Sequence, residues 1–175
     1  MRNASVADIR LLVLDVDGVL TDGRLHFGPR GEVLKVFHVR DGLGIQQVRQ
    51  AGIEVAVISG RKSPMVAARC RELGVRHLLQ GQSDKMAAFE RIVSKVKLQP
   101  HQCACVGDDV PDVQLMRKVG LAFAVADADP AAKQAAHVVT SMPGGHGAVR
   151  EVCDYLLACR TERADGPTAG RKGRR

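Results

Sequence analysis

The sequence predicts an α/β protein built on a doubly wound parallel sheet, and three observations favour this fold class. The apolar, β-rich run 11–16 is typical of a strand that is buried on both faces. Each later apolar run follows a segment with the residue pattern of a helix. The length of 175 residues, with 45% hydrophobic and 26% charged residues, suits one domain around one core.

The apolar runs predict the strands in order along the chain. They cover residues 11–16, 53–58, 75–79, 103–106, 121–125 and 138–139. The helix after the second run has recognisable ends, because Ser63-Pro64 suits its N-cap and first position and Gly74 suits its C-terminal stop. The result is a Rossmann-like alternation of strands and helices.

Three further helices complete the predicted framework. Ser83 is expected to cap the first of them, whose apolar residues recur at helical spacing along one side. That side consists of Met86, Phe89, Ile92, Val93 and Val96. The other two helices are expected over residues 109–118 and 147–159.

Two segments depart from the alternation. Residues 24–27 and 33–37 alternate in polarity and are joined by the Gly- and Pro-containing segment 28–31, which indicates a β-hairpin at about 24–37. Residues 161–175 contain Gly, Pro and charged residues without periodicity, so we expect a basic, disordered tail. The predicted domain therefore covers residues 1–160.

The composition argues against nucleic acid and membrane as partners. The net charge is +7, but residues 160–175 hold six Lys/Arg and two acidic residues and contribute +4 of it. With four Phe, one Tyr and no Trp, the chain lacks an aromatic ladder for stacking bases. No run of 18 apolar residues and no signal-peptide pattern is present, so we expect a cytoplasmic protein. The five cysteines lack C-x-x-C spacing and are expected to be reduced, buried thiols.

Aspartates follow the ends of two predicted strands. Asp15 and Asp17 end the first strand, and Asp108 and Asp109 end the fourth, with Asp112 shortly after. Because parallel strands share one carboxyl edge, these carboxylates converge and repel one another unless a cation lies among them. Hard oxygen ligands suit Mg²⁺, so a magnesium site is predicted. The alternative interpretation is a set of solvated turn and helix-cap aspartates.

A hydroxyl and a lysine follow the two strands between these aspartates. Ser59 comes after the second strand, where its hydroxyl and nearby backbone N–H groups can hold phosphate oxygens. Lys85 comes after the third strand and can neutralise a phosphate and a nucleophile. Each residue alone is more often structural, but the order Asp-x-Asp, Ser, Lys, Asp-Asp is typical of phosphoryl transfer.

This order resembles the four motifs of the haloacid dehalogenase superfamily. Longer segments are similar to the 3-deoxy-D-manno-octulosonate 8-phosphate (KDO 8-phosphate) phosphatase family, over nearly everything but the tail. These segments are 15–23, 38–42, 59–61, 80–85, 107–109 and 144–152. One departure is His146, where the family pattern has Arg.

The resemblance implies hydrolysis of a sugar-acid phosphomonoester through an aspartyl-phosphate, in lipopolysaccharide biosynthesis. Asp15 would be the nucleophile, and Asp17 would be the general acid and then the base. Mg²⁺ would bind Asp15, the carbonyl oxygen of Asp17 and Asp108. Ser59 and Lys85 would contact the phosphoryl oxygens.

The resemblance also implies a set of residues that contact the sugar acid. They are Asp17, His38, Val39, Arg40, Asp41, Gly42, Gln46, Arg61, Arg69 and Lys85. Arg61 and Arg69 lie about two helical turns apart, and one or both could bind a carboxylate. The alternative for both is a solvated helix arginine.

The chain is expected to lack a lid domain. Enzymes with this catalytic core carry a cap after the first strand or between the second and third, but residues 18–52 and 60–74 leave no room for one. The active site then needs a cover from elsewhere. A hairpin with little core of its own would pair with other copies, and the resemblance implies a homotetramer.

Two alternatives differ in function. A receiver domain would be a non-catalytic phosphate-binding module, but it places an aspartate at the end of the third strand, where this chain has Gln80. Within the hydrolases, a related nine-carbon sugar acid phosphate remains open as the substrate.

Overall fold

The computed structural model describes residues 6–164 and confirms the predicted α/β class. A six-stranded sheet has the order β5-β4-β1-β6-β7-β8, and every neighbouring pair in it is parallel. Its strands are β1 (Leu11–Leu14), β4 (Glu54–Ser59), β5 (His77–Gln80), β6 (Cys103–Gly107), β7 (Leu121–Ala124) and β8 (Val138–Val139). The reversal of strand order between β4 and β6, on either side of β1, places the switch point at the end of β1.

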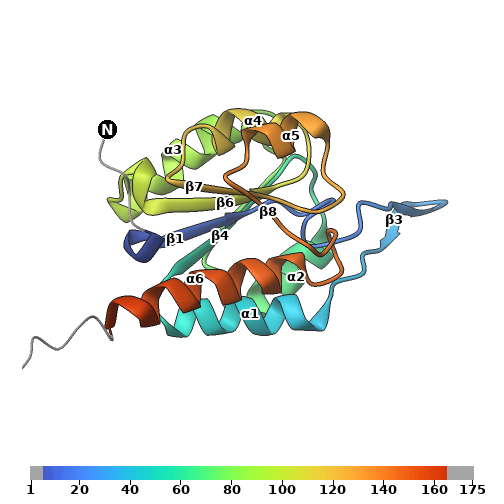
Figure 1. Ribbon diagram of the computed structural model, residues 1–175. Helices are drawn as coiled ribbons and strands as arrows, with labels where there is room; N and C mark the ends of the chain where they lie inside the picture. The colour runs from blue at the N-terminus through green and yellow to red at the C-terminus, as the bar shows by residue number, and fades with distance from the viewer. Residues whose placement is uncertain (1–5, 165–175) are drawn as a thin grey trace, which may run out of the picture.

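Helices cover both faces of this sheet (Figure 1). On one face lie α1 (Val39–Gln50), α2 (Pro64–Glu72) and α6 (Ala148–Ala164), and on the other α3 (Lys85–Val96), α4 (Val110–Met116) and α5 (Pro130–Ala135). Short 3₁₀ turns occur at Val6–Asp8 and Pro100–Gln102. The central strand β1 is therefore fully buried, as its apolar run predicts.

Only some of the helix caps predicted from the sequence are found in the structure. The helix α2 ends in the C-cap Leu73 with Gly74 at φ 67°, as predicted, but the Ser63 side chain makes no capping hydrogen bond. The prediction that Ser83 caps α3 is wrong, because the side chain of Asp84 accepts a hydrogen bond from the Ala87 N–H. A carboxylate one residue closer to the helix takes the capping position.

The C-terminal helix is longer than expected. It continues to Ala164, so the first four residues of the expected tail, 161–164, are helical. The rest of that tail lies outside the described residues. Among residues 6–164, no helix is long and apolar enough to cross a membrane.

The core between the layers is aliphatic with two central aromatic rings, Phe89 and Phe123. Met86 and Val96 pack at its margin, so the predicted apolar side of α3 faces the core. Cys103 and Cys105 are buried as predicted, and burial raises the pKa of the Cys103 thiol to about 12. Such a thiol stays protonated and unreactive.

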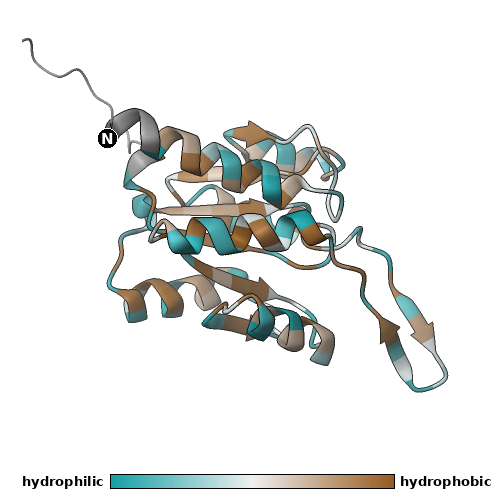
Figure 2. Ribbon diagram, turned by 90° about the horizontal axis from the view of Figure 1, so that it is seen from below, coloured by the Kyte–Doolittle hydropathy of each residue, from teal (hydrophilic) through white to brown (hydrophobic). Residues whose placement is uncertain are grey.

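The predicted hairpin forms from β2 (His26–Gly28) and β3 (Gly31–Leu34), which pair with each other and not with the main sheet. It projects from the body of the molecule (Figure 2). Phe27 and Val33 are 61% and 60% exposed, whereas Phe37 packs against the core. The described residues in the two gaps form this hairpin, α1 and α2, which leaves no cap domain there.

Candidate active site

The carboxyl ends of β1, β4 and β6 meet at one cleft of about 310 Å³. It is lined by Asp15, Asp17, Ser59, Gly60, Arg61, Gln82, Ser83, Lys85, Asp108, Asp109, Pro111 and Asp112. The structure therefore brings together all the residues predicted for nucleophile, acid, phosphate and metal. A cleft of similar volume at the start of β4 and β5 has no such group of carboxylates.

Three carboxylates form the floor of this cleft. Asp15, Asp108 and Asp112 each offer an oxygen, and these oxygens lie within 4.8 Å of one another. The Lys85 ammonium lies 2.9 Å from Asp15 Oδ1 and 2.6 Å from Asp112 Oδ1. Three negative charges thus face one positive charge.

Burial, and then repulsion within this group, raise the proton affinities of its carboxylates. Burial, and then the charges of Asp15 and Asp112, raise the pKa of Asp108 to about 8. Burial raises the pKa of Asp15 to about 6, against the opposing charge of Lys85. Although burial opposes it, the charges of Asp15 and Asp112 raise the pKa of Lys85 to about 12. A divalent cation with a preference for oxygen would relieve this excess of negative charge, so the residues fit Mg²⁺.

The two ends of this group are held by local hydrogen bonds. Asp112 accepts from the backbone N–H groups of Asp108 (3.2 Å) and Asp109 (3.4 Å) at the start of α4. After β1, Thr21 Oγ1 donates to the Val16 carbonyl at 3.3 Å and closes a tight turn. Gly18 in that turn has φ +95°, and a Cβ there would lie 2.1 Å from Asp108 Oδ2. Only glycine therefore lets the β1 turn approach this carboxylate so closely.

Hydrogen bonds around Ser59 hold the loop that follows β4. Ser59 is buried, and its Oγ accepts a hydrogen bond from the Arg61 N–H at 3.2 Å. The Ser59 carbonyl accepts from the Gln82 N–H at 3.0 Å, which ties this loop to the loop that carries Lys85. The two predicted phosphate-binding residues therefore have a fixed relation to each other.

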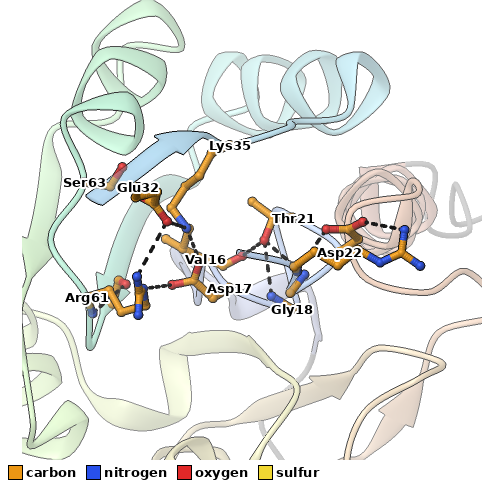
Figure 3. A network of polar contacts seen from close by, with 12 residues as sticks. Val16, Asp17, Gly18, Thr21, Asp22, Glu32, Lys35, Arg61 and Ser63 are labelled. Atoms are coloured by element: carbon orange, nitrogen blue, oxygen red, sulfur yellow. Dashed lines mark hydrogen bonds and ion pairs between the residues drawn. The ribbon is translucent and has the colours of Figure 1, made fainter. Parts of the chain in front are cut away.

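Asp17 takes part in a second polar network (Figure 3). Its carboxylate accepts a hydrogen bond from Lys35, whose ammonium also lies 3.0 Å from Glu32 Oε1. Arg61 faces the same two carboxylates, at 3.9 Å from Asp17 and 3.7 Å from Glu32. Although burial opposes it, hydrogen bonds to Asp17 and Glu32 raise the pKa of Lys35, so the ammonium stays charged.

Three residues of these networks have no role predicted from the sequence. Asp112 was noted only as an acidic residue after the fourth strand, although its place three residues after the N-cap Asp109 is a capping-box signal. Lys35 and Glu32 belong to the hairpin, and nothing in their spacing predicts contact with Asp17.

The remaining residues of the expected substrate set lie outside this cleft. Asp41 is 2% exposed and accepts from the Arg150 N–H at 2.8 Å, so its side chain joins α1 to the start of α6. Arg69 pairs with Glu72 at 2.9 Å. The others are His38, which is the N-cap of α1, the exposed Val39 and Arg40, the buried Gly42 and the exposed Gln46.

Comparisons with known proteins give one family model and several relatives. The family model described as haloacid dehalogenase-like hydrolase matches residues 74–152. The 3-deoxy-D-manno-octulosonate 8-phosphate phosphatase KdsC of Escherichia coli K12 is 53% identical over 154 residues, which are 88% of this chain and 82% of that protein.

Solved structures show the same likeness. The phosphatase of the same name from Yersinia pestis superposes with a TM-score of 0.88 and 46% identity, over 92% of this chain and 87% of that one. The Moraxella catarrhalis phosphatase, crystallised with magnesium ion, phosphate ion and a KDO molecule, gives a TM-score of 0.88 and 39% identity. That match covers 90% of this chain and 91% of the other.

Proposed function

This chain belongs to the KDO 8-phosphate phosphatase family of haloacid dehalogenase-like hydrolases, and from that membership we propose that it hydrolyses KDO 8-phosphate to KDO and inorganic phosphate. This reaction is a step of lipopolysaccharide biosynthesis. The observation that carries the proposal is the cleft in which Asp15 and Asp17 lie beside Lys85, Ser59 and Asp108.

The reaction has two displacements at phosphorus. In the first, an Asp15 oxygen forms a bond to phosphorus while the bond to the sugar oxygen breaks, and Asp17 gives its proton to that oxygen. In the second, water forms a bond to phosphorus, its proton passes to Asp17 and the bond to Asp15 breaks. Asp17 ends protonated and Asp15 ends free, so the protein returns to its starting state.

Charge stabilisation comes from residues that are already in place. Lys85, 9% exposed in its side chain, holds Asp15 at 2.9 Å and can contact a transferring phosphoryl oxygen. Ser59 and the loop N–H groups can bind the other phosphoryl oxygens. Asp15, Asp108 and the Asp17 carbonyl would hold Mg²⁺, with Asp112 beside them. When bound, this ion neutralises charge on the phosphoryl group.

Arg61 is the candidate for the substrate carboxylate. Its side chain is 42% exposed, lies at the cleft and packs 5.8 Å from the centre of the Phe27 ring. An arginine in this position can exchange its long contacts with Asp17 and Glu32 for a substrate carboxylate.

We also propose that the active form is a homotetramer in which neighbouring copies complete each site. Residues 6–164 form no cap over the cleft, and the projecting hairpin exposes apolar side chains beside it. Of the expected substrate contacts that do not line this cleft, the exposed ones are available to a neighbouring copy, namely Val39 at 76% exposure, Arg40 and Gln46. The four buried, reduced thiols Cys70, Cys103, Cys105 and Cys153 support a cytoplasmic location.

The test is turnover of a panel of sugar phosphates at fixed Mg²⁺, which includes KDO 8-phosphate and nine-carbon sugar acid phosphates. We expect the highest kcat/KM with KDO 8-phosphate. Asp15→Asn should reduce it by several orders of magnitude, beyond the ~10²–10³ typical of removing one stabilising donor. Higher kcat/KM with a nine-carbon substrate would replace the substrate assignment, and activity of Asp15→Asn within tenfold of wild type would refute the mechanism.

A further inference from the structure

Lys35 has an unusual position for a lysine on an exposed hairpin. Its side chain is 1% exposed, although it directly follows β3, a strand that pairs with β2 and not with the main sheet. A buried ammonium is costly unless it is paired and hydrogen-bonded. Lys35 meets this requirement with two carboxylates, those of Asp17 and Glu32.

Four charged side chains form a cycle of ion pairs in which positive and negative groups alternate (Figure 3). They are Lys35, Asp17, Arg61 and Glu32. Lys35 and Arg61 each face both carboxylates. The two cations face different oxygens of Asp17, because Lys35 contacts Oδ1 and Arg61 faces Oδ2. The Arg61 contact is 3.9 Å long and its side chain is 42% exposed, so Lys35 makes the tighter contact with Asp17.

We propose that Lys35 is a positioning residue, which holds the Asp17 carboxylate in the orientation for proton transfer and is itself held by Glu32. The inference rests on the proposed function, in which Asp17 protonates the sugar oxygen. Lys35 does not contact the reacting atoms in this role. It acts by fixing the rotamer of the acid that does, and a displacement of about 1 Å at such a group can cost ~10²-fold in rate.

The same contacts connect the hairpin to catalysis. Glu32 lies in β3, Lys35 directly follows that strand, and Phe27 of β2 packs against Arg61. Any event that orders or displaces the hairpin therefore moves the groups around Asp17. The hairpin is thus part of the active site as well as a surface for other copies.

The test compares two leaving groups. Lys35→Met removes the ammonium and keeps an unbranched side chain, and Lys118→Met makes the same substitution at an exposed lysine outside the hairpin and the cleft. We compare kcat/KM, which reports the first displacement and not the hydrolysis of the aspartyl-phosphate that both substrates share. We expect Lys35→Met to lower kcat/KM on KDO 8-phosphate by about 10–100-fold, and on p-nitrophenyl phosphate by less than threefold, since an aryl leaving group needs no proton. Lys118→Met should change neither value by more than about twofold.

A double-mutant cycle with Asp17→Asn identifies the residue through which Lys35 acts. If Lys35 positions Asp17, Lys35→Met should cost nothing further in the Asp17→Asn background. Equal losses on both substrates, or additive losses in the double mutant, would overturn the inference while leaving the phosphatase assignment intact. A wild-type protein without activity on KDO 8-phosphate would overturn both. If Lys35→Met does not fold, Lys35→Arg is compared on the same two substrates. A loss of activity confined to KDO 8-phosphate would support the inference, and an equal loss on both substrates would contradict it.

Discussion

Binding of Mg²⁺ to the cluster of Asp15, Asp108 and Asp112 should release protons, and the number of protons released should fall as the pH rises. In the metal-free protein, the pKa of Asp15 is raised to about 6 and that of Asp108 to about 8, in both cases mainly by burial. A metal ion binds the ionised carboxylates, so each protonated carboxyl must lose its proton when the ion enters.

The magnitude follows from these two values. At pH 5 both carboxyls are largely protonated and binding should release about two protons, at pH 7 about one, and above pH 9 almost none. Because the two carboxyls interact, the total is the meaningful quantity rather than the share of either residue. Affinity for Mg²⁺ should therefore rise steeply with pH on the acid side and level off above pH 8.

The free energy of unfolding of the metal-free protein should fall as the pH rises, whereas the affinity for Mg²⁺ should rise. The folded protein keeps protons that the unfolded chain releases, because the pKa of Asp108 rises from 3.8 to about 8 on folding. The free energy of unfolding contributed by this group therefore decreases as the pH rises through that window. Mg²⁺ should raise Tm more at pH 8 than at pH 5.5.

Isothermal titration calorimetry in buffers of different ionisation enthalpy measures the proton count directly. Asp108→Asn is the matched control, because it removes the carboxyl with the higher pKa and should lower the release at pH 7 by about one proton. Proton release that is zero at pH 6, or the same at pH 6 and pH 8.5, would refute the electrostatic account of this site.

Three further predictions concern other parts of the molecule. Arg61→Ala should cost about 1.5–3 kcal/mol in kcat/KM on KDO 8-phosphate and clearly less on a sugar phosphate without a carboxylate, and equal losses would exclude a carboxylate contact. Val33→Ser with Val36→Ser, at positions 60% and 58% exposed, should weaken association by about 2 kcal/mol or more, seen as smaller species in sedimentation. A monomeric wild type with full activity would contradict that architecture. Gly18→Ala should lower Mg²⁺ affinity at least tenfold in calorimetry, because the new Cβ would lie 2.1 Å from a carboxylate oxygen; unchanged affinity would contradict the close approach.

The sequence alone determined the sheet and the chemical groups at its edge. Apolar runs separated by helical segments can form only a limited number of folds, and parallel strands place their carboxyl ends side by side. Asp15 and Asp108 directly follow a strand, Ser59 ends one, and Lys85 starts the helix after the loop that follows β5. Their convergence could therefore be predicted without knowledge of side-chain directions. Helix ends were less predictable, since adjacent residues such as Ser83 and Asp84 compete for the same cap.

The tertiary structure decided which of these groups contact one another. Lys85 meets Asp112 across 27 residues, Lys35 meets Asp17 across 18, and Asp41 accepts from the Arg150 N–H across 109. Such pairs have no periodic signal, because they depend on how loops and a separate hairpin lie against the sheet. Lys35 shows the reason most clearly: in the sequence it is a polar residue in an exposed hairpin, and only the path of the chain back over the end of β1 buries its charge against Asp17.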